Sequence, residues 1–314
     1  MLNNLRVFFN FIRHQKIKNN KKIINFSILL FHRIVPEIKN DLLGTCIDVD
    51  SFRKIIKYLS LNYNIINPKD FNSLYESNKI QKNSIILSFD DGFIDNYTFA
   101  FPILKEFNTN AVFFLPTNYI SKKNTTWDWE IKKIIDYNYS ELIEKHNFFL
   151  KLNNKSKKNI LWNCINYLKN KNINYRNDFI QETYKLLKIK NSFNENDRCL
   201  NWTEVNEMQS KGMLFGSHTH NHTSLLGLKI DEIESELMKS KKLLEEHTKT
   251  KCNYFSYPFG SYNDFDNKIN KLVHDIGYTN IFSNIQGSND LNKNVNYLKR
   301  VIIKNKIDKY KLFF

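Results

Sequence analysis

The sequence is poor in cysteine, and it contains neither an internal repeat nor an extended low-complexity linker. Only four of its 314 residues are cysteines, and no two of them form a C-x-x-C pair. This spacing is typical of neither a zinc knuckle nor a disulfide scaffold, and it is compatible with the reduced thiols of the cytosol. We therefore expect all four to be small buried apolar residues: Cys46, Cys164, Cys199 and Cys252.

Long apolar runs are also absent, because no segment approaches the ~20 apolar residues of a membrane span. The N-terminus lacks a continuous apolar stretch followed by a small-residue cleavage site, so we expect a cytoplasmic protein. Within residues 1–24, basic residues accompany four apolar ones at helical spacing: Leu5, Phe8, Phe9 and Ile12. This pattern predicts a basic amphipathic arm on the inner membrane surface, with a helix packed on the protein's own core as the alternative.

Acidic residues are outnumbered, since 32 Asp and Glu stand against 47 Lys and Arg and give a formal charge of +15. Such a balance indicates an anionic partner. The lysines are scattered along the chain and no nucleic-acid motif accompanies them, which makes nucleic acid an unfavoured partner. An anionic membrane surface, or a substrate linked to a lipid phosphate or a nucleotide, fits the charge better.

Short apolar runs that favour strands alternate with helical patterns over most of the chain. The predicted strands are Ser27–Phe31, Ile85–Phe89, Ala111–Leu115, Met213–Gly216, Tyr254–Tyr257, Thr279–Ser283 and Tyr297–Ile303. The predicted helices are Asp50–Leu61, Pro68–Ser77, Tyr97–Phe107, Thr203–Lys211, Asp231–His247 and Asp264–Ile276. This alternation indicates parallel βαβ units and hence an α/β barrel over residues 25–314. In such barrels the residues that follow the strands meet on one face and form the active site.

One segment does not follow this alternation. Residues 121–200 are rich in Asn and Lys, helical in pattern and without a strong strand. We interpret them as a helical insertion between the third and fourth strands that lies over the active face. Trp127 and Trp129 inside it, and Trp202 just after it, are candidate platforms for sugar rings, with core packing as the alternative.

Two short motifs that follow predicted strands carry the chemistry. Ser88-Phe89-Asp90-Asp91-Gly92 places two carboxylates side by side, and Ser217-His218-Thr219-His220-Asn221-His222 places imidazoles four residues apart. Asp91 with His218 and His222 offers the oxygen and nitrogen ligands that suit Zn²⁺, with one position left for water. Asp90 is then free to act as a base. The alternatives are a simple turn for the acidic motif and capping or core roles for the histidines.

The motifs resemble those of a known family. Ser88–Gly92 resembles the first motif of the NodB-homology polysaccharide deacetylases, carbohydrate esterase family 4. His218–His222 resembles their second motif, His-Ser/Thr-x-x-His, and Tyr257–Asn263 resembles the third, which lines one side of the substrate groove. The three occur in family order, and the resemblance extends from Ser27 to Ile303 apart from the insertion.

The resemblance implies a distorted (β/α)₇ barrel that removes an N- or O-acetyl group from a sugar. It implies Asp90 as the base and a divalent ion, Zn²⁺ by default, on Asp91, His218 and His222. Substrate contacts are implied at Tyr257, Pro258, Phe259 and Gly260. A backbone N–H near Tyr257 is expected to stabilise the tetrahedral oxyanion.

Two groups that many family members possess are missing. Ser256 and Tyr257 stand where an Arg would pair with the base; Arg300 resembles an Arg of one branch, so we place it in the substrate site as a substitute. The late Leu-x-His motif that supplies the general acid is absent. The segment Phe31-His32-Arg33 resembles an early string of the poly-N-acetylglucosamine deacetylase-like branch. We therefore nominate His32 to protonate the leaving amine, with a structural role as the alternative.

The sequence thus predicts a metal-dependent sugar deacetylase that acts in cell-surface glycan assembly. A catalytically inactive barrel that binds a glycan or a partner is the alternative, favoured by the missing Arg and His. The complete ligand set and base oppose it, because buried unpaired carboxylates are costly without a function. A basic membrane-surface or nucleic-acid adaptor is a third hypothesis, and it predicts salt-sensitive binding that chelators leave unchanged.

Overall fold

A computed structural model describes residues 25–304 apart from residues 121, 123, 153–154, 190–194 and 292–295. The predicted amphipathic arm of residues 1–24 lies outside the described residues. Within the described part of the chain, no helix combines the length and apolar character needed to cross a membrane. All four cysteines are buried and free, as expected.

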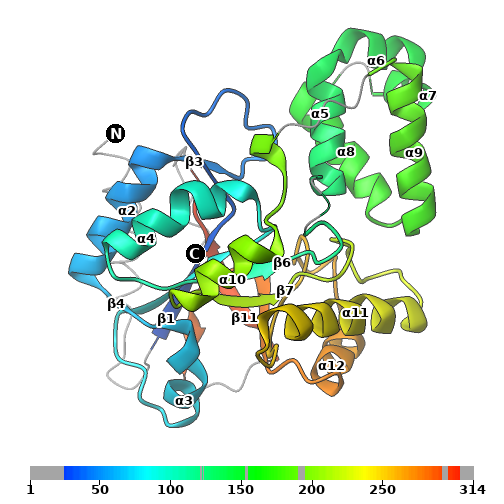
Figure 1. Cartoon of the computed structure of the whole chain (residues 1–314). Helices are drawn as coiled ribbons and strands as arrows, with labels where there is room; N and C mark the ends of the chain where they lie inside the picture. Colours follow the sequence, from blue (N-terminus) through cyan, green and yellow to red (C-terminus); the bar gives the residue numbers. More distant parts are fainter. Residues whose placement is uncertain are drawn as a thin grey trace.

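Seven parallel strands form a closed barrel (Figure 1). They are β1 (Asn25–Phe31), β5 (Ser84–Phe89), β6 (Val112–Leu115), β7 (Leu214–Ser217), β8 (Tyr254–Ser256), β9 (Asn280–Gln286) and β11 (Leu298–Ile302). The barrel closes because its first strand, β1, pairs in parallel with both the second barrel strand, β5, and the last, β11. Each strand overlaps one predicted from the sequence, so the (β/α)₇ barrel is confirmed.

Four further strands escaped sequence analysis because they are only two or three residues long. β2 (Arg33–Val35) and β3 (Cys46–Asp48) form a separate parallel pair above β1. β4 (Asn64–Ile65) adds to β5, and β10 (Asn289–Asp290) pairs antiparallel with β1. None of these short pairings alters the barrel.

Helices cover the outside of the barrel (Figure 1). They are α2 (Val49–Asn62), α3 (Phe71–Glu76), α4 (Phe101–Glu106), α10 (Trp202–Ser210), α11 (Ile230–Thr248) and α12 (Asn267–Asp275), with short turns η1 (Pro68–Asp70), η2 (Asn96–Ala100) and η3 (Glu195–Asp197). The last helix starts three residues later than predicted. Asp266 caps it by accepting from the N–H of Ile269, while Asp264 is buried and bonds elsewhere.

The insertion between the third and fourth barrel strands is helical, as predicted. It contains α5 (Trp127–Tyr137), α6 (Tyr139–Lys145), α7 (Asn147–Leu150), α8 (Lys157–Leu168) and α9 (Ile173–Leu186). These helices form a lobe at one side of the barrel (Figure 1). Their apolar faces build a second core, to which Ile131, Ile134 and Leu161 contribute fully buried side chains. The lobe therefore has its own apolar packing, and it also contacts the barrel.

The alternation of side chains along each strand decides which residues reach the barrel interior. One apolar cluster takes alternate positions from all seven barrel strands and fills the interior; it includes Ile28, Ile86, Phe114, Leu214, Tyr254, Phe282 and Leu298. The intervening positions, such as Leu87, Phe89 and Phe113, pack outward against the helices. Asp90 lies four positions after Ile86, so the same alternation places it on the interior side, just beyond the carboxyl end of β5.

We expect Phe113→Ala to lower the free energy of unfolding by about 3–5 kcal/mol, because it removes a fully buried ring from the layer between barrel and helices. Phe113 stacks on Phe89 with ring centroids 4.6 Å apart and packs on Phe215 at 5.8 Å. Urea unfolding followed by circular dichroism measures the loss. The control Met238→Ala, on the exposed face of α11, should change stability by less than about 0.5 kcal/mol. Equal stability of the two variants would contradict this packing.

Candidate metal centre

The two motifs meet at the carboxyl end of the barrel. Asp90 and Asp91 directly follow β5, and His218 directly follows β7. The backbone turns sharply after the acids: Asp91 has φ +71° and Gly92 φ +60°. A Cβ at Gly92 would meet the Leu115 side chain at 2.5 Å, so this position needs glycine for both conformation and space.

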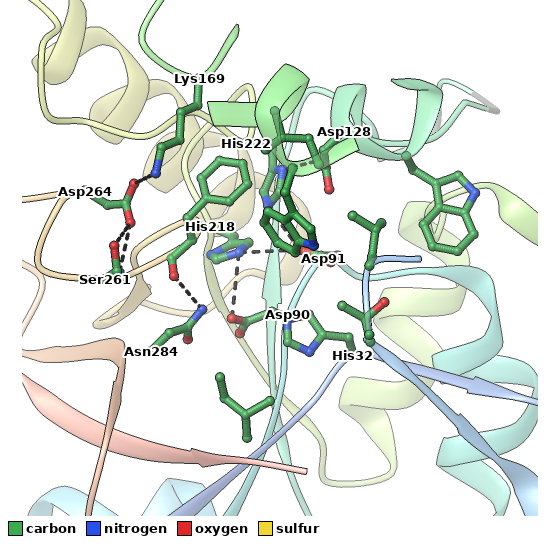
Figure 2. A pocket seen from close by; sticks show the side chains of 18 of the residues that line it. His32, Asp90, Asp91, Asp128, Lys169, His218, His222, Ser261, Asp264 and Asn284 are labelled. Carbon is green, nitrogen blue, oxygen red and sulfur yellow. Dashed lines mark hydrogen bonds and ion pairs between the residues drawn. The ribbon is translucent and has the colours of Figure 1, made fainter. Parts of the chain in front are cut away.

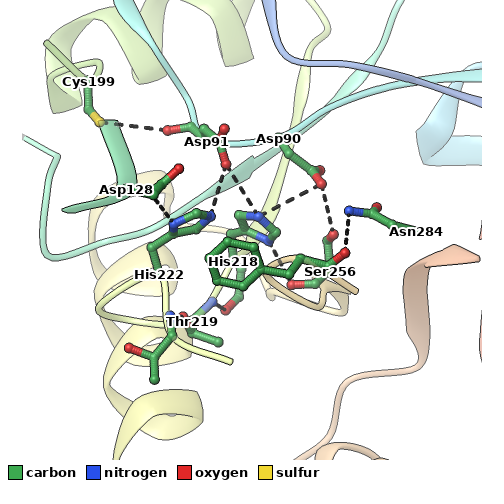
Figure 3. Close-up of polar contacts among 12 residues, drawn as sticks. Asp90, Asp91, Asp128, Cys199, His218, Thr219, His222, Ser256 and Asn284 are labelled. Carbon is green, nitrogen blue, oxygen red and sulfur yellow. Dashed lines mark hydrogen bonds and ion pairs between the residues drawn. The ribbon is translucent and has the colours of Figure 1, made fainter. Parts of the chain in front are cut away.

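Asp91, His218 and His222 form one buried cluster whose candidate ligand atoms all lie within 4.8 Å of one another. The Nε2 atoms of His222 and His218 lie 3.1 Å and 3.5 Å from Asp91 Oδ1 (Figure 3). Both Nδ1 atoms face away from the cluster. That of His218 lies 2.8 Å from the Ser256 carbonyl oxygen, and that of His222 lies 2.9 Å from Asp128 Oδ1.

These residues fit a divalent metal ion. A ring nitrogen bonded to a carbonyl or carboxylate oxygen carries the hydrogen, so in a neutral imidazole at either position Nε2 would present its lone pair on the side of Asp91, where an ion can bind. Two imidazole nitrogens and one carboxylate oxygen suit Zn²⁺ and related ions, and three protein ligands are typical of sites that retain an open position. The cluster therefore has the donors, the orientation and the burial of a catalytic metal site.

The electrostatics of the cluster also favour a cation. Burial by itself would raise the pKa of Asp91, but the neighbouring His222 and His218 hold it well below its usual range. Burial would lower the pKa of His222, yet Asp128 and Asp91 outweigh it and raise that pKa to about 10. A metal ion bound here would take the place of the positive charge that the imidazolium supplies, with release of a proton.

Asp90 is held apart from the cluster by a fully buried ion pair. Arg300 donates to both carboxylate oxygens, from Nη1 to Oδ1 at 2.8 Å and from Nη2 to Oδ2 at 2.6 Å. Ser256 Oγ adds a longer bond of 3.3 Å, and Arg300 Nε donates to the Ser283 carbonyl at 2.9 Å. Burial raises the pKa of Asp90, but Arg300 with His218 lowers it below the ordinary value. Asp90 is therefore an ionised carboxylate beside the metal cluster.

A cavity of about 350 Å³ opens onto these groups. Both the barrel and the insertion line it, and Figure 2 shows His32, Asp90, Asp91, His218 and His222 facing one another across it. His32 Nδ1 is buried and has no hydrogen-bond partner among the described residues. Burial lowers the pKa of His32 below its usual value, although Asp91 and Asp90 oppose this. The structure thus brings His32 to the same cavity as the acidic motif.

The predicted groove residues do not lie as expected. Tyr257 follows Ser256 on the opposite face of the strand, so its ring points outward and stacks on Phe265 at 4.0 Å. Its N–H donates to the Phe282 carbonyl at 3.1 Å and is not free to bind an oxyanion. Phe259 does line the cavity, whereas Pro258 and Gly260 do not. Gly260 shapes the turn, because a Cβ there would lie 2.7 Å from the Asn284 backbone nitrogen.

Arg300 also differs from the expected position of a substrate-site residue. It is fully buried and lies behind Asp90 rather than at the cavity surface. Its contact with Asp90 matches the charge-partner role for which the sequence nominated it. Ser256 and Asn284 complete this network, since both accept a hydrogen bond from Arg300 Nη2.

The tryptophans have three different environments. Trp127 is buried and donates its indole N–H to the His222 carbonyl at 2.8 Å. Trp129 lines the cavity and has the Arg33 guanidinium over its ring. Trp202 does not line the cavity and stacks on His247 at 4.0 Å. Packing is therefore the role of Trp127 and Trp202, and only Trp129 remains a candidate platform.

Sequence reasoning missed Asp128 and Trp162. Asp128 is buried and contacts His222, and Trp162 of α8 lines the cavity with Ile165 and Lys169. Asp128 lies between Trp127 and Trp129, which the sequence analysis singled out. No local pattern predicts that its carboxylate contacts the imidazole of His222, 94 positions further along the chain. Only the tertiary packing brings them together.

The fold and the cluster define a barrel with a candidate metal site at the carboxyl ends of its strands. The polysaccharide deacetylase family model matches residues 77–281, and the chain belongs to that family. The chain is 22% identical over 248 residues to "Putative polysaccharide deacetylase YxkH" of Bacillus subtilis (strain 168). That match covers 78% of this chain and 60% of the relative, so the chain spans less than two thirds of the relative's length.

Solved structures share the fold at low sequence identity. The Streptococcus pyogenes deacetylase PplD in complex with acetate superposes with a TM-score of 0.61 at 17% identity, over 91% of this chain and 95% of that one. IcaB from Ammonifex degensii superposes with a TM-score of 0.57 at 16% identity, over 90% and 92% of the two chains. The barrel of this chain is therefore that of known deacetylases.

We expect the wild-type protein to bind about one divalent ion per chain and the variants His218→Ala and His222→Ala to bind none, because each loses one of three ligands. Elemental analysis after reconstitution and desalting measures the stoichiometry. His220→Ala is the matched control: it lies between the two ligands, but its ring faces Thr117 Oγ1 at 2.9 Å. Metal retention in the His218 and His222 variants would contradict this site.

Proposed function

We propose that this protein is a metal-dependent hydrolase that removes an N-acetyl, or O-acetyl, group from a sugar in cell-surface glycan biosynthesis. The observation that carries the proposal is that two adjacent carboxylates have different partners. Asp91 faces the two imidazoles, whereas Asp90 is paired with Arg300 and faces the same cavity. Hydrolysis of this kind needs one acid as a ligand and a second as a base.

A divalent ion on Asp91, His218 and His222, with Zn²⁺ as the default, would polarise the acyl carbonyl and lower the pKa of a water molecule. Asp90 then accepts the proton of the attacking water at its carboxylate. Arg300 and Ser256 fix that carboxylate by hydrogen bonds and keep it ionised. The low pKa of Asp90 makes it a weak base, which is sufficient only for a strongly acidified water.

The leaving amine requires a proton, and His32 is the proposed donor. Its imidazole lines the cavity with the Asp90 and Asp91 side chains, whose charges oppose the lowering of its pKa by burial. Phe259 is the proposed source of the oxyanion's backbone donor. Tyr257 and Gly260 use their N–H groups within the protein, Pro258 has none, and the Phe259 N–H has no partner among the described residues. A free N–H beside the cavity is what a developing oxyanion needs.

The cavity walls support a small or end-bound glycan as substrate. Trp129, Trp162 and Ile165 of the insertion give one wall an apolar surface suited to a sugar ring. We propose a substrate of the poly-N-acetylglucosamine type, or a sugar linked to a lipid phosphate or a nucleotide. The excess of Lys and Arg fits a cytoplasmic protein that meets this substrate at an anionic membrane face.

Replacement of the base and of the acid should separate catalysis from metal binding. We expect Asp90→Asn and His32→Ala each to lower kcat about 10²–10⁴-fold while metal content stays unchanged. Acetate release from N-acetylglucosamine oligomers measures turnover, and elemental analysis measures the metal. His274→Ala on α12, outside the cavity, should retain wild-type activity. Normal acetate release by Asp90→Asn would refute the base assignment. A wild type that binds metal but deacetylates no sugar would favour the inactive barrel.

Removal of the Arg300 charge should change the pH dependence of the reaction. Asp90 must be ionised to act, so activity is lost as pH falls through its pKa, which Arg300 lowers. In Arg300→Met, Asp90 stays buried without its cation, so its pKa should rise. We expect the acid limb of the kcat/KM profile to move to higher pH by roughly 1–3 units. Arg300→Lys keeps a cation and should move it less. Metal content measured at each pH separates this effect from metal loss, and an unshifted limb in folded Arg300→Met would count against the pairing.

A further inference from the structure

We propose that the helical insertion is part of the metal centre, with Asp128 of α5 as the residue that positions the ligand His222. This inference rests on the metal site of the proposed function and goes beyond it, because it assigns a chemical task to the insertion. Three consecutive residues at the end of the second motif and just after it, Asn221, His222 and Thr223, each accept or share a hydrogen bond with an insertion side chain.

The first turn of α5 binds His222 at two points. Asp128 Oδ1 lies 2.9 Å from the Nδ1 atom of the imidazole, and the indole of Trp127 donates to the His222 carbonyl at 2.8 Å. Both side chains are buried, and Asp128 is only 7% exposed. One contact fixes the ring and the other fixes the backbone that carries it.

A second helix of the insertion holds the residues on either side. Arg176 of α9 is fully buried and donates to the Asn221 carbonyl at 3.2 Å and to Thr223 Oγ1 at 3.1 Å. Its guanidinium also lies over the Trp127 ring, 4.7 Å from the centroid. Two helices that are distant in the sequence therefore converge on the same short segment.

The two imidazole ligands differ in what holds them. His218 follows β7 directly, its N–H donates to the Leu115 carbonyl at 3.0 Å, and its ring bonds to the Ser256 carbonyl. These partners all belong to the barrel. His222 lies five residues beyond β7 in a left-handed conformation, with φ +51°, which a residue with a Cβ adopts at a cost. His222 Nε2 faces Asp91 of the barrel at 3.1 Å, but the hydrogen-bond partners of its Nδ1 atom and of its carbonyl both come from the insertion.

The Asp128 carboxylate fixes which ring nitrogen of His222 faces the ion. An ionised carboxylate only accepts hydrogen bonds, so in the neutral imidazole that a metal ion requires Nδ1 carries the single hydrogen and Nε2 presents its lone pair on the side of Asp91. An amide in place of the carboxylate can donate to Nδ1 and thereby stabilise the tautomer with hydrogen on Nε2, which cannot bind a cation. Loss of such an outer partner typically weakens metal binding about 10–100-fold.

The test is the zinc affinity of Asp128→Asn and Asp128→Ala, measured by competition with a chromophoric chelator. We expect both variants to bind zinc about 10–100-fold more weakly than wild type. Asp136→Asn is the matched control, since it removes the same charge from the far end of α5, where Asp136 pairs with Lys132 at 2.8 Å. Its affinity should equal that of wild type. Circular dichroism establishes that each variant is folded, and the isosteric Asn variant keeps the test decisive if the Ala variant unfolds.

A spectroscopic readout distinguishes positioning from general stability. In the protein saturated with zinc, ¹⁵N chemical shifts of the imidazoles should report a change at Nδ1 of His222 in Asp128→Asn, while those of His218 stay as in wild type. Zinc affinity within twofold of wild type in folded Asp128→Asn would overturn the inference and leave the proposed function standing. A wild-type protein that takes up no zinc would overturn the proposed function and this inference together.

Discussion

Two adjacent carboxylates buried at the end of one strand are the constraint around which the rest of the structure is arranged. A buried carboxylate without a partner costs several kcal/mol or loses its charge. Asp90 and Asp91 each remain ionised because each faces a different set of positive groups. The side chains that meet this requirement are Arg300 of β11 and the two imidazoles that follow β7, His218 and His222.

The two acids acquire different chemistry from their partners. Arg300 binds both oxygens of Asp90, so that carboxylate is fixed in place with its charge balanced. Asp91 has only imidazoles, whose charge a metal ion can replace. The backbone supports the same distinction, because Asp90 directly follows the last strand residue, Phe89, and the left-handed turn begins at Asp91. One residue of separation along the chain thus becomes a separation between a base and a ligand.

The insertion is more than a lobe on the surface, because its side chains contact the candidate metal site. Its apolar core is its own, but Trp127, Asp128 and Arg176 are directed at the second motif. Trp162 of α8 also lines the cavity. The same helices therefore contact the candidate ligand His222 and line the cavity, whereas the contacts that hold His218 and Asp90 come from the barrel.

The sequence by itself determined the barrel and the candidates for the metal ligands and the base, because each of these is a local pattern. Strand periodicity and the Asp-Asp-Gly and His-x-x-x-His motifs each fall within a few residues. Only the tertiary structure decided what surrounds them. The outward turn of Tyr257, the burial of Arg300 behind Asp90 and the contact of Asp128 with His222 depend on strand parity and helix packing between distant segments. A single sequence carries no local signal for such contacts, since they arise only when the barrel closes and the insertion packs against it.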